Sequence, residues 1–241
     1  MIDLLPQIDE WYAAGERIAV ATVVRVAGSA PRPVGAKMIV SSTGRLAGSV
    51  SGGCVETTVF EEMMDVLKGG DPRVLHFGIT DDMIWDVGLA CGGTIDVLVA
   101  ELHRELVEAL VNCLEDGDAC ALASTVSGAG LGESALITAG ETSLGPVDTE
   151  AAELAREMLS SRSEFGQIHQ LPSGDEVFVE PFLAPPVLIV VGGVHTAIPL
   201  TRFAKELGFY VIVVDPRAKF ANEERFPLAD EVLLEWPDEA L

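Results

Sequence analysis

The chain repeats one order of predicted elements, and this repeat constrains its fold more than any other feature. Apolar runs predict strands at residues 17–26 and 36–41, followed by a Gly-containing turn and by a helix that starts near Cys54. The same order returns later, with strands predicted at 119–126 and 133–138 and a helix at 149–159. Because such internal similarity indicates duplicated structural units, residues 1–182 are expected to form one duplicated α/β domain.

The last part of the chain has a different pattern. A continuous apolar run at residues 187–191 is typical of a buried parallel strand, and Gly192-Gly193 interrupts it. An amphipathic helix at 197–207 and a second apolar strand at 209–214 follow. This order is the β-α-β start of a doubly wound fold, so the sequence predicts an α/β protein that ends in a Rossmann-like parallel domain.

The boundaries of this second domain follow from its flanks. The prolines of Leu183-Ala184-Pro185-Pro186 predict a stiff linker, so the domain is placed at residues 187–241. Only one further strand, at 231–234, is apparent, and the domain is therefore expected to be shortened and incomplete. An open sheet edge favours pairing with another chain, and a homodimer is expected.

Composition argues against several function classes. The formal net charge of -23 argues against nucleic acid, because binding to its phosphate backbone draws its affinity from clustered Lys and Arg. No apolar stretch reaches the roughly 18 residues of a membrane span, and Asp3 stands where a signal peptide would be basic, so a cytoplasmic protein without a membrane partner is expected. The four cysteines form no C-x-x-C pair, which predicts free thiols and no metal site; Cys113 and Cys120 are expected to be buried in the core.

One window of this acidic chain contains no acid at all. Between Arg17 and Val55 the charged residues are only cations, namely Arg17, Arg25, Arg32, Lys37 and Arg45. One interpretation is chance combined with a buried sheet face. The other is an electropositive pocket for an anion, in which Arg32 and Lys37 would bind the ligand.

The sequence Ser51-Gly52-Gly53-Cys54 lies at the end of this window. Two glycines before a helix let backbone N–H groups point toward an anion, and the same field favours the thiolate of a cysteine, which is a nucleophile and a soft-metal ligand. A second thiol, Cys91, precedes Gly92-Gly93, and both loops are expected to meet at one ligand. The alternative for Cys54 is a small buried residue after a Gly-rich turn. Structural zinc is not expected, since a third ligand is missing.

The Rossmann-like region carries an imperfect dinucleotide fingerprint. Gly192 and Gly193 follow the strand and Asp215 ends the next one, where an acid would bind a ribose, with Arg217 beside it. Val194 replaces the glycine that lets a pyrophosphate approach the backbone, which weakens the case for NAD(P). Binding of a nucleotide-bearing ligand and a pure scaffold role both remain open.

Taken together, these motifs resemble the XdhC/CoxI family of accessory proteins for molybdenum enzymes. The similarity lies in residues 22–25, 28–38 and 48–56, in Cys91-Gly92-Gly93, and in C-terminal residues around Asp215-Pro216-Arg217 and 224–227, with His195 where the family often has a histidine. The resemblance implies a chaperone that binds molybdopterin (molybdenum cofactor), assists its sulfuration and delivers it to a molybdenum hydroxylase apoenzyme, with a sulfur-donating desulfurase as a further partner.

This resemblance assigns roles to residues and favours a cofactor chaperone over a stand-alone enzyme. Cys54 and Cys91 are then the reactive thiols, and the cofactor-binding candidates are Arg32, Lys37, Ser51, Gly52, Gly53, Gly92, Gly93, Gly192, Gly193, His195, Asp215 and Arg217. Two alternatives stay open, an NAD(P)-dependent oxidoreductase and a structural partner that docks the target enzyme without any small ligand.

Overall fold

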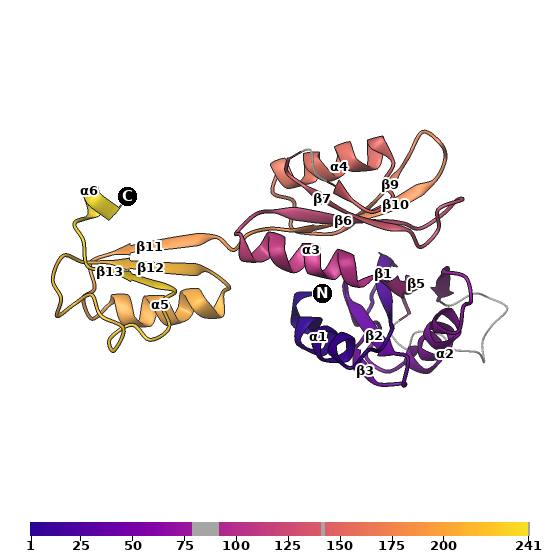
Figure 1. The fold of residues 1–241 in the computed structure, drawn as a ribbon, viewed down its shortest axis with the longest axis horizontal. Helices are drawn as coiled ribbons and strands as arrows, with labels where there is room; N and C mark the ends of the chain where they lie inside the picture. Colours follow the sequence, from indigo (N-terminus) through magenta and orange to yellow (C-terminus); the bar gives the residue numbers. More distant parts are fainter. Residues whose placement is uncertain (79–91, 141–142, 241) are drawn as a thin grey trace. The chain divides into compact units, whose positions relative to one another are not determined.

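The computed structural model describes residues 1–78, 92–140 and 143–240 (Figure 1). The chain divides into two compact units, Met1–Leu183 and Ala184–Leu241. No helix among the described residues is both long and apolar enough to cross a membrane.

The first unit is built from two copies of one arrangement. The first copy consists, in chain order, of η1 (Ile2–Leu4), α1 (Leu5–Ala13), β1 (Ile18–Ala27), β2 (Lys37–Ser41), β3 (Leu46–Gly48), α2 (Glu56–Leu67), β4 (Arg73–Phe77) and β5 (Thr94–Leu102). The second consists of α3 (Arg104–Glu115), β6 (Cys120–Thr125), β7 (Ser134–Thr138), β8 (Ser143–Leu144), α4 (Thr149–Ser160), β9 (Gln167–Gln170) and β10 (Glu176–Phe182).

The two copies have the same strand order. The first sheet runs β3-β2-β1-β5-β4 and the second β8-β7-β6-β10-β9, and every neighbouring pair in both is antiparallel. The predicted duplication is therefore confirmed as a repeated topology, although the sequence suggested only the order of elements and not the antiparallel pairing.

Each copy covers the outer face of its sheet with one helix. Val59, Met63 and Val66 lie on one face of α2 and pack on the first sheet, because residues three and four apart share a helix face. Helix α4 covers the second sheet in the same way. The inner faces pack around α1 and α3, and they also contact each other directly through Val24 of β1 and Phe178 of β10. Figure 1 shows α4 and α2 on opposite outer sides of this unit.

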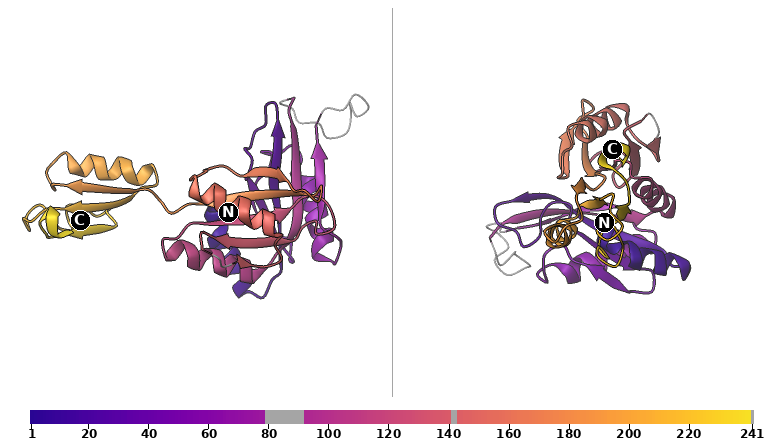
Figure 2. Two further views of the ribbon diagram at one scale, coloured as in Figure 1. Left: turned by 90° about the horizontal axis from the view of Figure 1, so that it is seen from above. Right: turned by 90° about the vertical axis from the view of Figure 1, so that its left-hand side faces the viewer.

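The second unit is a small parallel β-α-β layer. Its elements are β11 (Val187–Val191), α5 (Ala197–Glu206), β12 (Tyr210–Val214), β13 (Glu231–Leu233) and the short α6 (Pro237–Ala240). The strands form a parallel sheet in the order β11-β12-β13. Helix α5 packs on one face, through Ala197 and Ala204 (Figure 2, orange helix). The predicted α/β fold class with a Rossmann-like parallel unit is confirmed.

Candidate functional site

Three connections meet at one end of the first sheet. They are the β1–β2 loop, the β3–α2 loop and the residues just before β5. A Cβ atom on Gly93 would lie 2.1 Å from the carbonyl oxygen of Ser29, so only glycine fits there. On the other side, a Cβ on Gly52 would lie 3.7 Å from Cβ of Pro31. The β1–β2 loop thus lies against both Gly-rich segments that the sequence singled out, and we call these three connections the loop cluster.

Cys54 lies on the β3–α2 loop of this cluster. Its side chain is exposed, which contradicts the alternative of a small buried residue. Helix α2 begins at Glu56 with Val55 as its N-cap, so the thiol stands just before the helix, as predicted. Cys91 lies outside the described residues, and the predicted meeting of the two thiols stays a prediction. Gly92, its neighbour, is exposed with a φ of 75°.

The backbone amides of the β3–α2 loop bind an anion that belongs to the chain itself. Ser51 N and Gly53 N donate to the carboxylate of Glu56 at 2.9 Å and 2.8 Å. Gly52 N donates instead to Oγ of Ser49, at 2.9 Å. The expectation that Ser51, Gly52 and Gly53 offer free amides to a ligand is therefore corrected: in this structure all three are taken by side chains of the loop and helix.

Sequence reasoning missed Glu56, although a signal was present. A glutamate directly after Ser-Gly-Gly-Cys-Val, with two serines upstream, can reach back over the turn. Burial opposes its ionisation, but hydrogen bonds from the hydroxyls of Ser51 and Ser49 and from backbone amides outweigh that effect and lower the pKa of Glu56 to about 2. The carboxylate is thus ionised over the whole physiological range, and it cancels the positive end of α2.

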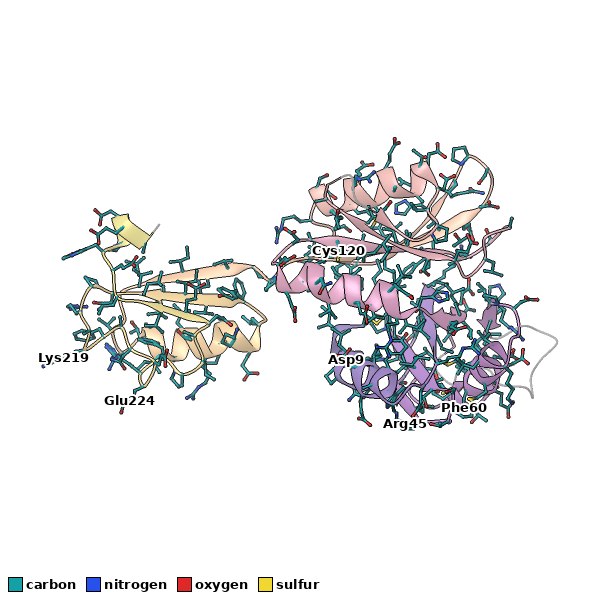
Figure 3. The ribbon with its side chains drawn as sticks, in the orientation of Figure 1. Asp9, Arg45, Phe60, Cys120, Lys219 and Glu224 are labelled. Carbon is teal, nitrogen blue, oxygen red and sulfur yellow. The ribbon has the colours of Figure 1, made fainter. Side chains whose placement is uncertain are left out.

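Four of the five cations in the acid-free window are paired with carboxylates from other parts of the chain. Ion pairs join Arg17 to Glu101 (Nε–Oε1 2.7 Å), Arg25 to Asp96 and Glu176 (3.3 and 2.9 Å), and Arg45 to Glu10 and Glu16 (2.6 and 2.7 Å; Arg45 is labelled in Figure 3). The predicted electropositive pocket is therefore largely neutralised by distant acids.

The two cations of the window that were predicted to bind the ligand, Lys37 and Arg32, differ in exposure and in pairing. Lys37 was predicted to bind the ligand, but its side chain is 2% exposed and its ammonium group lies 2.6 Å from the carboxylate of Glu180 in the second copy. This buried pair links the two copies, and it occupies the ammonium group of Lys37 in place of an external anion. Arg32 is exposed on the β1–β2 loop, and within the described part of the chain it forms no ion pair. Among the cations of the window, it is the one that is both exposed and outside the ion pairs of the described residues.

The other two described cysteines lie in the apolar core and not in the loop cluster. Cys113 of α3 and Cys120 of β6 are buried in the same apolar cluster, as predicted. Burial, with a further contribution from Cys113, raises the pKa of Cys120 well above its usual range, so this thiol stays protonated. Figure 3 labels Cys120 next to α3. Within residues 1–78, 92–140 and 143–240, no group of three His, Cys, Asp or Glu side chains is arranged to hold a metal ion.

In the second unit, the predicted dinucleotide residues bind one another. The carboxylate of Asp215 is buried and accepts from Gly193 N at 3.0 Å and from Arg217 at three donors, the backbone N, Nε and an Nη, at 2.9, 2.8 and 2.7 Å. The hydrogen bonds from Arg217, working against burial, hold the pKa of Asp215 far below its usual range. A carboxylate with both oxygens engaged in this way is not free to bind a ribose.

The glycines of this unit have an internal role as well. A Cβ on Gly193 would lie 2.2 Å from the carbonyl oxygen of Phe220, so only glycine fits against this backbone. Gly192 has a φ of 102°, which favours glycine at the turn after β11. His195 is exposed and makes no hydrogen bond to the described residues. These contacts correct the expectation that Gly193, Asp215 and Arg217 offer free groups to a nucleotide, and they favour a scaffold role.

Comparison with known proteins places both units in one family. The model of the XdhC and CoxI family matches residues 11–78, and the model of the XdhC Rossmann domain matches residues 188–240. The chain belongs to the XdhC/CoxI family. The first of these matches spans β1 to β4 and therefore includes the β1–β2 and β3–α2 loops of the loop cluster, whereas none of the second copy is included.

Named relatives of this XdhC/CoxI chain include two bacterial proteins. It is 29% identical over 234 residues to a probable xanthine dehydrogenase subunit of Bacillus subtilis, an alignment that covers 94% of this chain and 68% of the relative. It is 36% identical over 108 residues to the molybdenum cofactor insertion chaperone PaoD of Escherichia coli, which covers 44% of this chain and 33% of that protein. A solved structure of a xanthine dehydrogenase from Bacillus halodurans matches with a TM-score of 0.69 and 26% identity, over 98% of this chain and 69% of the other.

Proposed function

We propose that this XdhC/CoxI protein binds molybdenum cofactor and assists its insertion into an apoenzyme of the xanthine dehydrogenase or carbon monoxide dehydrogenase type. The relative PaoD is named a molybdenum cofactor insertion chaperone. In this chain the proposal depends on one observation above all: Cys54 is an exposed thiol on a loop against which the β1–β2 loop packs.

The residues present suit this cargo. A thiolate is a soft ligand that can contact molybdenum or carry sulfur, and Cys54 is reachable from outside. A molybdopterin carries a phosphate, and a guanidinium binds phosphate through paired hydrogen bonds. Arg32, exposed on the neighbouring loop and outside any described ion pair, is the residue that we assign to this phosphate. Cys91 is proposed as the second thiol, and Gly93, two residues further along the chain, lies against Ser29.

The finer parts of this function are further proposals. Assisting sulfuration would use the Cys54 thiolate to attack the outer sulfur of a cysteine persulfide on a desulfurase. A sulfur–sulfur bond forms on Cys54 as the one in the donor breaks, and the desulfurase cysteine leaves as a thiolate. Self-association stays a prediction; Val187, Ile189 and Val191 on β11 are 57%, 39% and 56% exposed, an apolar surface of the kind that marks contacts. A clean monomer in light scattering at micromolar concentration would argue against the homodimer. A cytoplasmic location likewise stays a prediction.

The alternative of an NAD(P)-dependent oxidoreductase is not proposed. Two groups that such an enzyme would use to bind the dinucleotide, the Asp215 carboxylate and the Gly193 amide, are hydrogen-bonded to each other. Isothermal calorimetry with NADH and NADPH is expected to show no binding.

The test of the proposed function is the pterin content of protein purified from a host that makes molybdenum cofactor. We expect pterin in the wild type and a large loss in Cys54→Ala. Arg32→Ala is expected to weaken pterin binding about tenfold or more, the usual effect of losing a charge-assisted hydrogen bond. The matched control is Arg202→Ala, which removes another exposed arginine, from α5, and should change nothing. Equal pterin in wild type and Cys54→Ala would refute the thiol role.

A further inference from the structure

The loop before α2 is folded around a carboxylate that the helix supplies. One oxygen of Glu56 accepts hydrogen bonds from Ser49 Oγ at 2.7 Å and from Ser51 N at 2.9 Å. The other accepts from Gly53 N at 2.8 Å, from Val55 N at 3.2 Å and from Ser51 Oγ. Every second residue from Ser49 to Val55 is thus tied to one side chain.

These bonds fix the backbone on both sides of Cys54. The amides of Gly53 and Val55, its two neighbours, both donate to Glu56, while the Cys54 side chain is exposed. Gly52 and Gly53 have φ values of 75° and 120°, which bend the chain back toward the carboxylate in conformations that other residues adopt only with strain. The direction of the thiol is therefore set by Glu56 together with the two glycines.

The second copy shows that a helix at this place does not need such an arrangement. Helix α4 follows a shorter connection, and Asp148 at its N-cap accepts from Glu150 N at 2.8 Å. That contact satisfies a helix amide and nothing in the preceding loop. In the first copy the amides that Glu56 binds belong to the loop, so its role exceeds the capping of α2.

We infer that Glu56 is a positioning residue, whose carboxylate folds residues 49–55 and thereby presents Cys54 to the ligand. The geometric part of this inference is independent of the ligand. Its consequence for cofactor binding rests on the proposed function.

Two substitutions separate the reach of this side chain from its charge. Glu56→Gln keeps the length but removes the charge and turns an NH2 group toward the donors. Glu56→Asp keeps a negative charge in the first turn of α2, which the helix dipole favours, but it is one methylene too short to reach all five donors. Glu61→Gln is the matched control, because it removes the same charge from an exposed position of the same helix.

Hydrogen exchange of the peptide covering residues 49–55 measures the loop directly. Both Glu56 variants are expected to exchange about tenfold faster there, because charge-assisted hydrogen bonds protect these amides, while Glu61→Gln matches the wild type. Glu56→Asp should keep a thermal midpoint close to the wild type and yet lose pterin severalfold. A role confined to helix stability would instead leave the Glu56→Asp protein with wild-type pterin.

Unchanged exchange in residues 49–55 of both variants would overturn the inference, and so would wild-type pterin in Glu56→Asp with a loosened loop. If the wild type itself carries no pterin, it is the proposed function that fails, and the exchange rates still decide whether Glu56 holds the loop. Should Glu56→Gln not fold, Ser49→Ala removes one donor to the same carboxylate without altering α2 and must also loosen the loop.

Discussion

The two copies of the first unit share a fold but differ at the connection between the third strand and the following helix. Both copies reach it through a glycine of positive φ, Gly48 at 78° and Gly145 at 97°. From there, the first copy uses seven residues, 49–55, before α2, and the second uses only three, 146–148, before α4. The extra length in the first copy contains Gly-Gly-Cys. The same scaffold thus carries a loop with an exposed thiol in one copy and a short connection without a cysteine in the other.

The second copy contributes carboxylates in place of such a loop. Glu176 and Glu180 of β10 pair with Arg25 and Lys37 of the first copy. Arg25 also pairs with Asp96 of its own copy, whereas the ion pair of Lys37 is with Glu180. The comparison teaches that the second copy, which lacks a counterpart of Cys54, supports the first copy with its carboxylates.

The largest effect is expected at the buried pair between the copies. Lys37→Met leaves the carboxylate of Glu180 buried without its partner, which costs about 3–5 kcal/mol of unfolding free energy. Urea unfolding measures this loss. The double variant Lys37→Met/Glu180→Leu should recover most of the lost stability, because an apolar pair of similar volume replaces the buried ions.

An exposed pair provides the matched control. Arg17→Met breaks the ion pair with Glu101, in which the Arg17 side chain is 52% exposed and the Glu101 side chain 28%. The substitution should cost less than about 1 kcal/mol of unfolding free energy. A loss for Lys37→Met as small as that for Arg17→Met would show that the copies are held together by their apolar contacts alone.

The next effect concerns the glycines at which the two copies are alike. A Cβ on Gly48 would lie 2.3 Å from the carbonyl oxygen of Lys37, and one on Gly145 would lie 2.5 Å from that of Ser134. Gly48→Ala and Gly145→Ala should therefore each cost about 2–3 kcal/mol, from the positive φ and the clash together. Thermal unfolding of both variants tests this equality. A much smaller cost in one copy would mean that the two turns are not equivalent.

Much of this fold is visible in the sequence because the underlying forces are local. The apolar run at 187–191 coincides with β11, and Val59, Met63 and Val66 repeat at helical spacing. Both copies of the strand and helix order were predictable for the same reason. The place of Cys54 just before a helix was predictable too, since Gly52-Gly53 signals a turn before a helix, but its exposure was not.

The charges of the site could not be predicted, because their partners are distant in the sequence. Lys37 and Glu180 are separated by 143 positions, and Arg25 and Glu176 by 151. A cation without acids nearby in sequence therefore looked free when it was paired. Glu56 was overlooked for a related reason. An acid in the first turn of a helix is ordinary, and only the turn at Gly52-Gly53 brings the loop amides to it.

A graft between the copies tests their division of labour at a smaller cost in stability. Replacing residues 49–55 by Pro-Val-Asp, the connection of the second copy, removes Cys54 and both buried valines, Val50 and Val55, and supplies one valine in their place. We expect folding with a loss of about 1–3 kcal/mol and no bound pterin. Pterin retained by the graft would place the site outside this loop, and an unfolded graft would show that the copies are not interchangeable at this point.

The smallest effect is a pH dependence confined to the loop of the first copy. The pKa of Glu56 is lowered to about 2 by its hydrogen bonds, so its contribution to loop stability is complete above the ordinary value of 4.5. It is lost as the pH falls from 4.5 toward 2, because only the ionised carboxylate accepts from all its donors. The amide resonances of Gly53 and Val55 should therefore shift together in an NMR titration with a midpoint near pH 2. Glu56→Gln should abolish this titration and Glu61→Gln should preserve it. A midpoint near 4.5 would mean that the carboxylate does not hold the loop in solution. In that case the following helix would support the connection no more in the first copy than in the second.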